Sequence, residues 1–372
     1  MNQAALQSSS LLLSFELGNS KWLLTFGNGQ RVRRAEIKAR DLGALDAQID
    51  AARKKFNLVP SAPVHSCYEA GRDGFWLHRA LSARGVSNLV IDPSSIEVNR
   101  RMRRAKNDSL DGEALLRLLA RYIAGERRHF RVVRVPDEKD EDARRPQREL
   151  ERLTKERTAH INRIRSLLAL EGVVLKPGSA GFLAALGNAR RWDGTPLGEH
   201  LIAEIHDELE RMALLERQIK KLRRQQDARV EHAPEDVKHK KLEALRRLKG
   251  INRSAYVLVF EFFGWRAFAN RRQLGAAAGL VGTPYQSGDK MHEQGISKAG
   301  SARIRTLMVE LAWSWLRFQP RSKLTQWFQQ RFGGGGRLRR IGIVALARRL
   351  LIALWRMVEH GVVPEGAAFK SA

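Results

Sequence analysis

Three polar residues at distant positions have the types and surroundings that suit phosphodiester chemistry. Ser287 stands in a turn-prone Gln-Ser-Gly context, within the segment 283–300, among glycines and basic residues. Far upstream, Asp108 and Asp111 stand three residues apart at the start of a helical pattern. A serine becomes a useful nucleophile when it is exposed near a base or a metal, with cations around the phosphate. These residues therefore predict a site that cuts or joins a nucleic-acid backbone.

Two further carboxylates stand where they could join the aspartate pair. Glu16 ends the first predicted strand, and Glu69 ends the fourth. Four convergent carboxylates repel one another unless divalent cations hold them. Two Mg²⁺ ions about 4 Å apart clamp the attacking and leaving oxygens of a phosphodiester, and carboxylate oxygens are the ligands that Mg²⁺ prefers. We therefore expect Glu16, Glu69, Asp108 and Asp111 to bind Mg²⁺ or Mn²⁺.

Each of these acids also has an ordinary structural role open to it. Glu16 could face solvent beside a turn, and Glu69 could pair with Arg72. Asp108 could cap the helix, while Asp111 could interact favourably with the helix dipole. Other acids rank lower because their strand-end geometry or helical phase is worse: Asp73, Asp92 and Glu113.

The charge of the chain points to a polyanionic partner. Its 372 residues include 67 Lys and Arg against 40 Asp and Glu, which gives a formal net charge of +27. The excess recurs in the segments 100–106, 144–165, 238–249 and 337–349. Because each neutralised phosphate releases counterions, a charge spread this widely favours nucleic acid. The alternatives, a solvated surface or a basic membrane-surface protein, would hardly avoid binding nucleic acid non-specifically.

Other features restrict the class of protein. The hydrophobic fraction of 43% is ordinary for a soluble globular protein. One cysteine, Cys67, excludes an intramolecular disulfide framework and a Cys-rich zinc site. The N-terminus lacks the basic region of a signal peptide, and no stretch approaches the ~18 apolar residues of a membrane span. We expect a cytoplasmic, nucleoid-associated protein with no membrane contact.

The first 135 residues alternate short apolar runs with helical patterns, which is typical of an α/β domain. The predicted strands are 11–17, 21–26, 30–38, 63–69 and 88–92, and the predicted helices are 41–56, 74–84 and 110–123. Three antiparallel strands followed by helix, strand, helix, strand and helix is the order of an RNase H-like fold. In that fold the ends of neighbouring core strands converge with a C-terminal helix, as the acidic set requires.

The remainder of the chain reads as mostly helical. A charged linker precedes two long amphipathic helices, 147–171 and 201–229, with apolar residues at roughly heptad spacing. They predict either an antiparallel coiled coil or dimer stalk, or a helical hairpin packed on its own domain. A helix, a Lys249-Gly250 turn and a second apolar helix follow, resembling a helix–hairpin–helix whose turn amides can hold a phosphate. The Gly-rich run 331–337 leads into a last helix, 338–359.

Several stretches together resemble the transposases of the DEDD insertion-sequence family, the RNA-guided bridge recombinases. They occur in the same order as in that family and span nearly the whole chain: FELGNSKW, SCYEAGRDGFWL, RAKNDSLDGEALL, LRRLKGI, RRQLGAAAGLVGTPYQSGDK and GISKAGSARIRTLMVELAW. The second half is the more distinctive, since the first rests on a few acidic residues.

The resemblance implies an α/β plus α architecture in three parts. Residues 1–135 would form a RuvC-like domain of RNase H fold, 136–237 a linker and coiled-coil helices, and 238–372 a helical transposase domain. The family's enzymes form homodimers that pair into tetramers. A non-coding bridge RNA encoded beside the gene pairs with donor and target DNA.

The family's functional residues fall on particular positions of this chain. Its four acidic metal ligands match Glu16, Glu69, Asp108 and Asp111, and its serine, which forms a covalent phosphoserine link to DNA, matches Ser287. The first acid is usually Asp, so Glu16, one methylene longer, implies a slightly wider site. Gly282-Thr283-Pro284 stands for the commoner Leu-Thr-Pro, a difference that we interpret as neutral.

Other residues complete or compete with this assignment. Ser297 fits better as the N-cap of a helix from about Gly300, and Tyr285 lacks the Arg/His/Tyr setting of a tyrosine recombinase. Basic residues near these motifs are candidate nucleic-acid contacts: Arg100, Arg101, Arg103, Arg104, Lys106, Lys249, Lys290, Lys298 and Arg303. Two other functions fit the sequence: a metal-only nuclease or Holliday-junction resolvase, and a nucleic-acid binding protein whose catalytic site has decayed at Glu16.

Overall fold

The structure is a computed structural model that describes residues 10–96, 108–232, 235–287 and 290–371. Within these ranges, the side chains at 108–110, 285–287 and 290–294 are outside the description. The chain divides into two compact units, Met1–Val135 (unit 1) and Pro136–Ala372 (unit 2).

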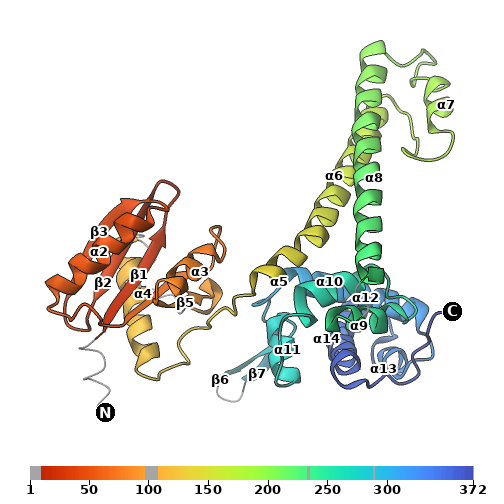
Figure 1. The fold of residues 1–372 in the computed structure, drawn as a ribbon. Helices are drawn as coiled ribbons and strands as arrows, with labels where there is room; N and C mark the ends of the chain where they lie inside the picture. Colours follow the sequence, from red (N-terminus) through yellow and green to blue (C-terminus); the bar gives the residue numbers. More distant parts are fainter. Residues whose placement is uncertain (1–9, 97–107, 233–234, 288–289, 372) are drawn as a thin grey trace. The chain divides into compact units, whose positions relative to one another are not determined.

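A mixed sheet forms the middle of the described part of unit 1 (Figure 1). Its strands are β1 (Leu11–Leu17), β2 (Lys21–Gly27), β3 (Val32–Lys38), β4 (Val64–Glu69) and β5 (Ser87–Ile91). They lie in the order β3-β2-β1-β4-β5, with β1, β2 and β3 antiparallel and with β4 parallel to both β1 and β5. The helices are α2 (Leu42–Lys55), α3 (Trp76–Ala83) and α4 (Asp108–Ile123). The predicted element order of an RNase H-like fold is thereby confirmed.

The two faces of this sheet have separate cores, because successive side chains of a strand point to opposite faces. Leu13 and Phe15 of β1 belong to the core that includes Leu45 of α2 and Leu77 of α3. Leu12, on the other face, packs with Leu115, Leu119 and other residues of α4. One face of the sheet is therefore covered by α2 and α3, and the opposite face by α4.

Unit 2 begins with a long helical hairpin (Figure 1). Its helices are α5 (Glu138–Ala143), α6 (Arg145–Leu170), α7 (Phe182–Gly187) and α8 (Glu199–His232). Leu153, early in α6, packs with Ile219, late in α8, whereas Leu168 packs with Ile205, so the two long helices are antiparallel. The structure thus shows a hairpin within one chain. Ile205 is fully buried inside it, so a charge at this position would disrupt the hairpin itself.

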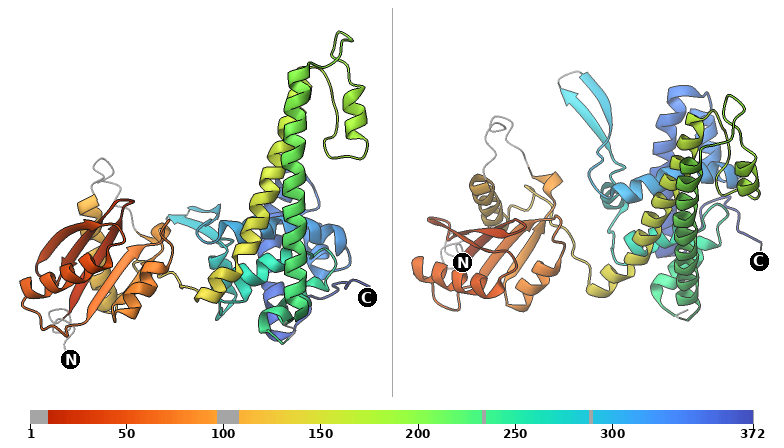
Figure 2. Two further views of the ribbon diagram at one scale, coloured as in Figure 1. Left: turned by 45° about the horizontal axis from the view of Figure 1, so that its top comes forward. Right: turned by 90° about the horizontal axis from the view of Figure 1, so that it is seen from above.

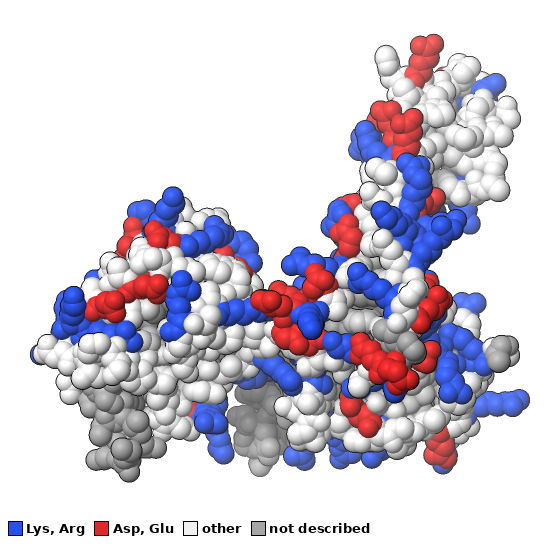
Figure 3. Space-filling view, viewed as in Figure 1, with Lys and Arg blue, Asp and Glu red and all other residues white. Residues whose placement is uncertain are grey.

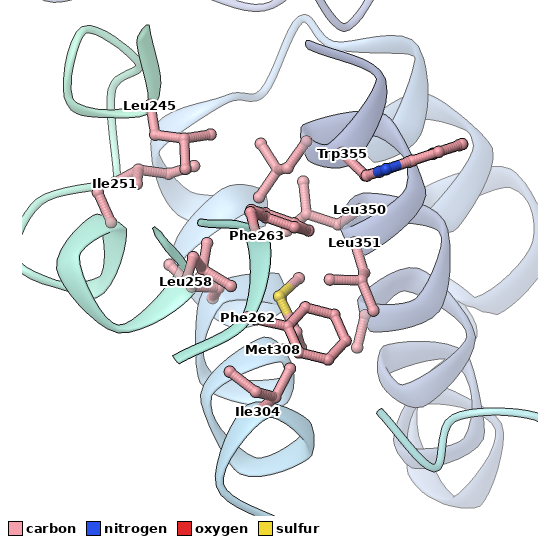
Figure 4. Packing of buried hydrophobic residues seen from close by; sticks show 14 of the residues in the cluster. Leu245, Ile251, Leu258, Phe262, Phe263, Ile304, Met308, Leu350, Leu351 and Trp355 are labelled. Atoms are coloured by element: carbon pink, nitrogen blue, oxygen red, sulfur yellow. The ribbon is translucent and has the colours of Figure 1, made fainter. Parts of the chain in front are cut away.

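The remainder of unit 2 is a helical body with one β-hairpin. It contains α9 (Val237–Arg246), α10 (Ser254–Leu258), the π-helical turn η3 (Val259–Phe263), α11 (Arg271–Ala277), β6 (Gly282–Ser287), β7 (Lys290–Ile296), α12 (Ala302–Phe318), α13 (Lys323–Phe332) and α14 (Gly336–His360). Phe262 and Phe263 of η3 pack against Met308 of α12 and Leu351 of α14 in its core (Figure 4). None of the described helices is both long and apolar enough to cross a membrane.

A buried carboxylate joins the helical hairpin to this body. Glu261 of η3 accepts two hydrogen bonds from Arg148 of α6, at 2.9 and 3.2 Å, and one from Arg303 of α12 at 2.8 Å. Arg144, which is itself buried and stacks over the ring of Trp265, lies 4.0 Å from the same carboxylate. Two guanidinium groups from the start of α6 and one from α12 therefore surround one negative charge.

The start of α12 differs from its prediction. Ser301, not Ser297, is the N-cap, because its side chain accepts a hydrogen bond from the amide of Ile304. The preceding Gly300 has φ near 130°, which L-residues rarely adopt, and a Cβ there would lie 2.6 Å from a carbonyl oxygen. This glycine sets the chain direction just before the cap, so the helix begins four residues later than Ser297 would allow.

We predict that Glu261→Gln lowers the free energy of unfolding of unit 2 by about 3–5 kcal/mol, because it removes the buried negative charge that Arg144, Arg148 and Arg303 share. The matched control is Glu149→Gln on the surface of α6, where Glu149 pairs with Arg152 in solvent. An exposed pair of this kind contributes less than about 1 kcal/mol. Denaturant unfolding followed by Trp fluorescence reports mainly on unit 2, which holds six of the eight tryptophans. Equal destabilisation by the two variants would contradict the assignment.

Candidate active site and nucleic-acid interface

Glu16 and Glu69 stand at the same edge of the sheet. β1 and β4 are parallel neighbours whose last registered pair is Phe15 opposite Tyr68, and each glutamate is the next residue of its strand. Phe15 and Tyr68 belong to the core on the α2 and α3 face. Because side chains alternate, both glutamates belong to the opposite face, which α4 covers.

Helix α4 begins at that edge. Ser14 of β1 donates a hydrogen bond from Oγ to the carbonyl of Gly112 at 2.6 Å, while Leu12, two residues back, packs in the core with Leu119. The helix therefore runs antiparallel to β1, and its first turn points toward the strand end that carries Glu16. Gly112 is required at this contact, since a Cβ would lie 2.5 Å from Oγ1 of Thr25.

The backbone thus gathers the four predicted acids at one end of the sheet. Glu16 is half-buried, while Glu69 and Asp111 are exposed; Asp108 is described only as the first residue of α4. Burial, together with the nearby charge of Glu69, raises the pKa of the Cys67 thiol, which packs on the same face. Among the side chains that the structure describes, no three His, Cys, Asp or Glu are placed to hold a metal ion.

The three acids that ranked lower have other partners. Glu113 on α4 lies next to the candidate set but pairs with Arg34 of β3, and Asp92 caps a 3₁₀ turn. Asp73, largely buried, pairs with Arg72 at 3.2 Å. These contacts give each of them a structural role.

Ser287 stands at the end of a β-strand, whereas the sequence predicted a loop. It is the last residue of β6, opposite Lys290, the first of β7, with two residues between them. The hairpin stands out from the helical body of unit 2 (Figure 2). Pro284 and the glycines around it weakened the strand signal, because both residue types are disfavoured in strands. The structure leaves the side chain of Ser287 undescribed, so its placement rests on the backbone register.

The basic residues predicted to contact nucleic acid differ in whether the structure describes them and in whether their charge is paired. Five of them, Arg100, Arg101, Arg103, Arg104 and Lys106, lie outside the described residues. Lys290 opens β7, and Lys298 is exposed with φ near 54°. Arg303 is different because Glu261 and Glu151 hold its guanidinium at 2.8 and 2.6 Å. Its charge is therefore neutralised within unit 2.

Two amides at the Lys249-Gly250 turn are bonded within the chain rather than free for a phosphate. The amide of Lys249 donates to the carbonyl of Ala368 at 3.0 Å, and that of Ile251 donates to Leu248. The C-terminal segment thus occupies the turn through a bridge between Leu248 and Phe369. The exposed side chain of Lys249 is what this turn can present to a polyanion.

Positive charge is nevertheless spread over the surface of both units. Figure 3 shows Lys and Arg side chains on unit 1, along the long helical hairpin and over the body. Some of them gather in a way that the sequence segments did not predict: a groove of about 1270 Å³ beside α14 is lined by nine Lys and Arg residues. The signal was present in the arginines of the segment 337–356, whose spacing places several on one helix face.

Comparison with known proteins extends over most of the chain. Residues 27–171 match a family model described as a DEDD transposase of the IS110 type, and residues 242–326 match one described as the transposase IS116/IS110/IS902 family. The second match contains the hairpin with Ser287.

Individual relatives agree with the family models. A Sinorhizobium fredii protein named as a transposase is 42% identical over 97% of this chain and 95% of its own length. A family 20 transposase of Pseudomonas aeruginosa is 30% identical over 83% of this chain and 87% of its own, and the transposase for insertion sequence element IS1111A of Coxiella burnetii is 26% identical over 76% and 74%. The chain therefore belongs to the IS116/IS110/IS902 family of transposases, enzymes that act on DNA.

Proposed function

We propose that this transposase is a site-specific DNA recombinase of an insertion sequence, guided by a bridge RNA, which cuts and joins DNA through a covalent link to Ser287. The observation that carries the proposal is the backbone placement of the acids. Two adjacent strand ends and the first turn of α4 bring Glu16, Glu69, Asp108 and Asp111 to one edge of a sheet. In this proposal residues 1–135 are the RuvC-like domain, 136–237 the linker and long helices, and 238–372 the transposase domain.

The donor chemistry of the acidic set fits Mg²⁺ or Mn²⁺. All four donors are carboxylates, hard ligands, and those whose side chains are described are exposed or half-buried at the sheet edge. Bound there, the metal would neutralise charge on the reacting phosphate. Glu16 and Glu69 would hold it from the rigid sheet, while Asp108 and Asp111 would close the site from α4. The extra methylene of Glu16 gives this ligand a longer reach than an aspartate would have.

Ser287 would supply the nucleophile. Its Oγ forms a bond to phosphorus as one phosphorus–oxygen ester bond of the DNA backbone breaks, which releases a sugar hydroxyl. The serine proton passes to a carboxylate of the acidic set, and a proton is returned to the departing sugar oxygen. Because the phosphoserine ester conserves the phosphodiester bond energy, attack by another sugar hydroxyl rejoins DNA and restores the serine. Lys290, opposite Ser287 in the hairpin register, provides positive charge beside the phosphate.

The acids lie in unit 1 and the serine in unit 2. The proposed reaction therefore requires residues of both units, which one chain or two partner chains can supply. A homodimer that assembles to a tetramer, with donor and target DNA bound together, is the assembly that we propose.

The tip of the long hairpin supports contact with another chain. Large apolar side chains are exposed there, between 60% and 93%: Leu170, Val174, Leu183 and Trp192. Exposed apolar clusters of this kind commonly mark protein interfaces. The charge of +27 in turn supports a stable complex with RNA.

The acidic set is tested by Asp111→Asn and Asp108→Asn. Each removes a ligand charge from the sheet edge and should reduce strand cleavage more than the ~10–100-fold typical of residues that only support a ligand. Glu113→Gln, two residues beyond Asp111 but paired with Arg34, is the control and should retain cleavage. Glu16→Asp should cleave at least as well as the natural chain. Cleavage of labelled DNA in Mg²⁺ measures all four variants, and undiminished cutting by both aspartate variants would remove them from the site.

The role of Ser287 is tested by trapping the adduct on a suicide DNA substrate. The natural chain should yield a protein–DNA band on a denaturing gel, with the link mapped to the peptide containing Ser287. Ser287→Ala should lose the band and recombination but keep nucleic-acid binding, whereas Ser297→Ala should keep all three. A metal-only nuclease would behave differently: Ser287→Ala would still cut, and no covalent band would form with either protein.

The assembly is tested by light scattering that resolves protein and nucleic-acid mass. Purified from cells that carry its own locus, without nuclease and at low salt, the protein should elute with RNA and at least two chains. Deleting the non-coding DNA beside the gene should remove the RNA. Trp192→Glu should reduce the protein mass to one chain, since its side chain is 79% exposed and does not support the fold. If the protein purified from cells with the intact locus is a single chain without RNA, both the proposed RNA partner and the proposed dimer are contradicted.

A further inference from the structure

The basic groove beside α14 is lined by residues other than the proposed catalytic ones. It is formed by one face of α14, by α11 and α13, and by the base of the β6–β7 hairpin, with a volume of about 1270 Å³. Along α14, cations line it from Arg337 to Arg356, a span of roughly 28 Å at about 1.5 Å per residue. The groove is therefore elongated along a rigid element.

The charged residues that line the groove are almost all positive. Nine lining residues are Lys or Arg, and the one acid among them, Glu365, is paired with Lys323. Arg271, Arg337, Arg340 and Arg356 are exposed. Exposed guanidinium groups that line one groove favour a polyanion, because binding releases counterions and each fork matches a phosphate.

The floor of the groove is apolar. Trp327 lines it with Arg349 stacked 3.9 Å above the ring, and Ile341 and Val362 are each about half exposed. Duplex DNA presents mainly its phosphates and sugars to a protein surface. Apolar side chains on the floor form no hydrogen bonds or ion pairs with these groups. Unpaired bases, in contrast, pack on apolar and aromatic surfaces while their phosphates reach flanking cations. The combination of floor and walls therefore fits a single strand better than a duplex.

The groove also lies on the path of the strand that Ser287 would hold. Gly282 and Ile296, at the base of the hairpin, line it, and Ser287 ends β6 five residues beyond Gly282. At ~3.4 Å per residue, the hairpin tip lies about 17 Å along the strand from that base. A stacked DNA strand rises ~3.4 Å per nucleotide, so roughly five nucleotides join the reacting phosphate to the groove.

We propose that this groove binds an unpaired DNA strand next to the cleaved phosphate and holds it while it is joined to Ser287. The inference rests on the proposed function of Ser287 and adds the substrate's form: the DNA is unpaired on one side of the cut. By its length, the groove accommodates about eight stacked nucleotides. DNA is the occupant because the strand continues from the serine ester.

The test is equilibrium binding of a labelled 15-nucleotide single-stranded DNA to the full-length, nucleic-acid-free protein. Duplex DNA and single-stranded RNA of the same sequence are measured beside it, at several salt concentrations. The groove variant is Arg337→Gln, Arg340→Gln and Arg356→Gln together. The matched control removes the same charge from exposed arginines of the same unit outside the groove: Arg317, Arg321 and Arg331, each →Gln.

The groove variant should weaken single-stranded DNA binding at least tenfold, and the slope of log affinity against log salt should fall by about two. The control should weaken it less than threefold. Ile341→Gln, at a half-exposed floor position, keeps the charge and the fold; it should weaken single-strand binding with no change in salt slope and leave duplex binding intact. Equal losses in groove and control variants would overturn the proposal, as would a loss confined to duplex or to RNA.

Failure of this inference can be told apart from failure of the proposed function. Ser287→Ala leaves the groove intact and should bind single-stranded DNA as the natural chain does. If no covalent adduct ever forms while the groove variant still loses single-strand binding, the serine assignment falls and the groove stands. If the adduct forms and the groove variant binds single-stranded DNA normally, the groove assignment is wrong and the assignment of Ser287 is unaffected.

Discussion

A single buried carboxylate, Glu261, fixes how the parts of unit 2 are held together. It lies in a π-helical turn and receives hydrogen bonds from Arg148 of α6 and Arg303 of α12. The long hairpin of helices and the helix that follows the β-hairpin are thereby held on one core. Burying this charge is favourable only because its cationic partners are in place, so the three segments depend on one another.

The contact with Glu261 matters for function because it fixes the start of α12, next to the β6–β7 hairpin. The first turn of this helix follows the β6–β7 hairpin after a few residues, and Arg303 in that turn is held by Glu261. The base of the hairpin is also fixed by the Ser297 amide, which donates to the carbonyl of Val281 at 2.8 Å, and by Ser301, whose amide donates to Ala277. A candidate nucleophile at the end of β6 is thus presented from an anchored base, as catalysis by positioning requires.

In unit 1 a rigid sheet holds the candidate catalytic residues in place. The parallel register of β1 and β4 and the antiparallel course of α4 place acids from three elements at one edge. The contact is specific because Gly112 leaves no room for a side chain against Thr25. The two units therefore contribute different chemistry to the proposed recombination: carboxylates on a rigid edge, and a serine on a projecting hairpin with a basic groove at its base.

The sequence by itself determined the elements of unit 1 and the residue types of the site. Short apolar runs located β1 and β4, which end at Leu17 and Glu69, and the helical pattern placed the start of α4 within two residues of Asp108, because these signals are local. Only tertiary structure decided the rest. The β6–β7 hairpin has weak strand propensity, and Arg303 is neutralised by an acid 42 residues away in the chain. The basic groove unites residues from α11, α13, α14 and the hairpin, and such long-range packing leaves no local pattern.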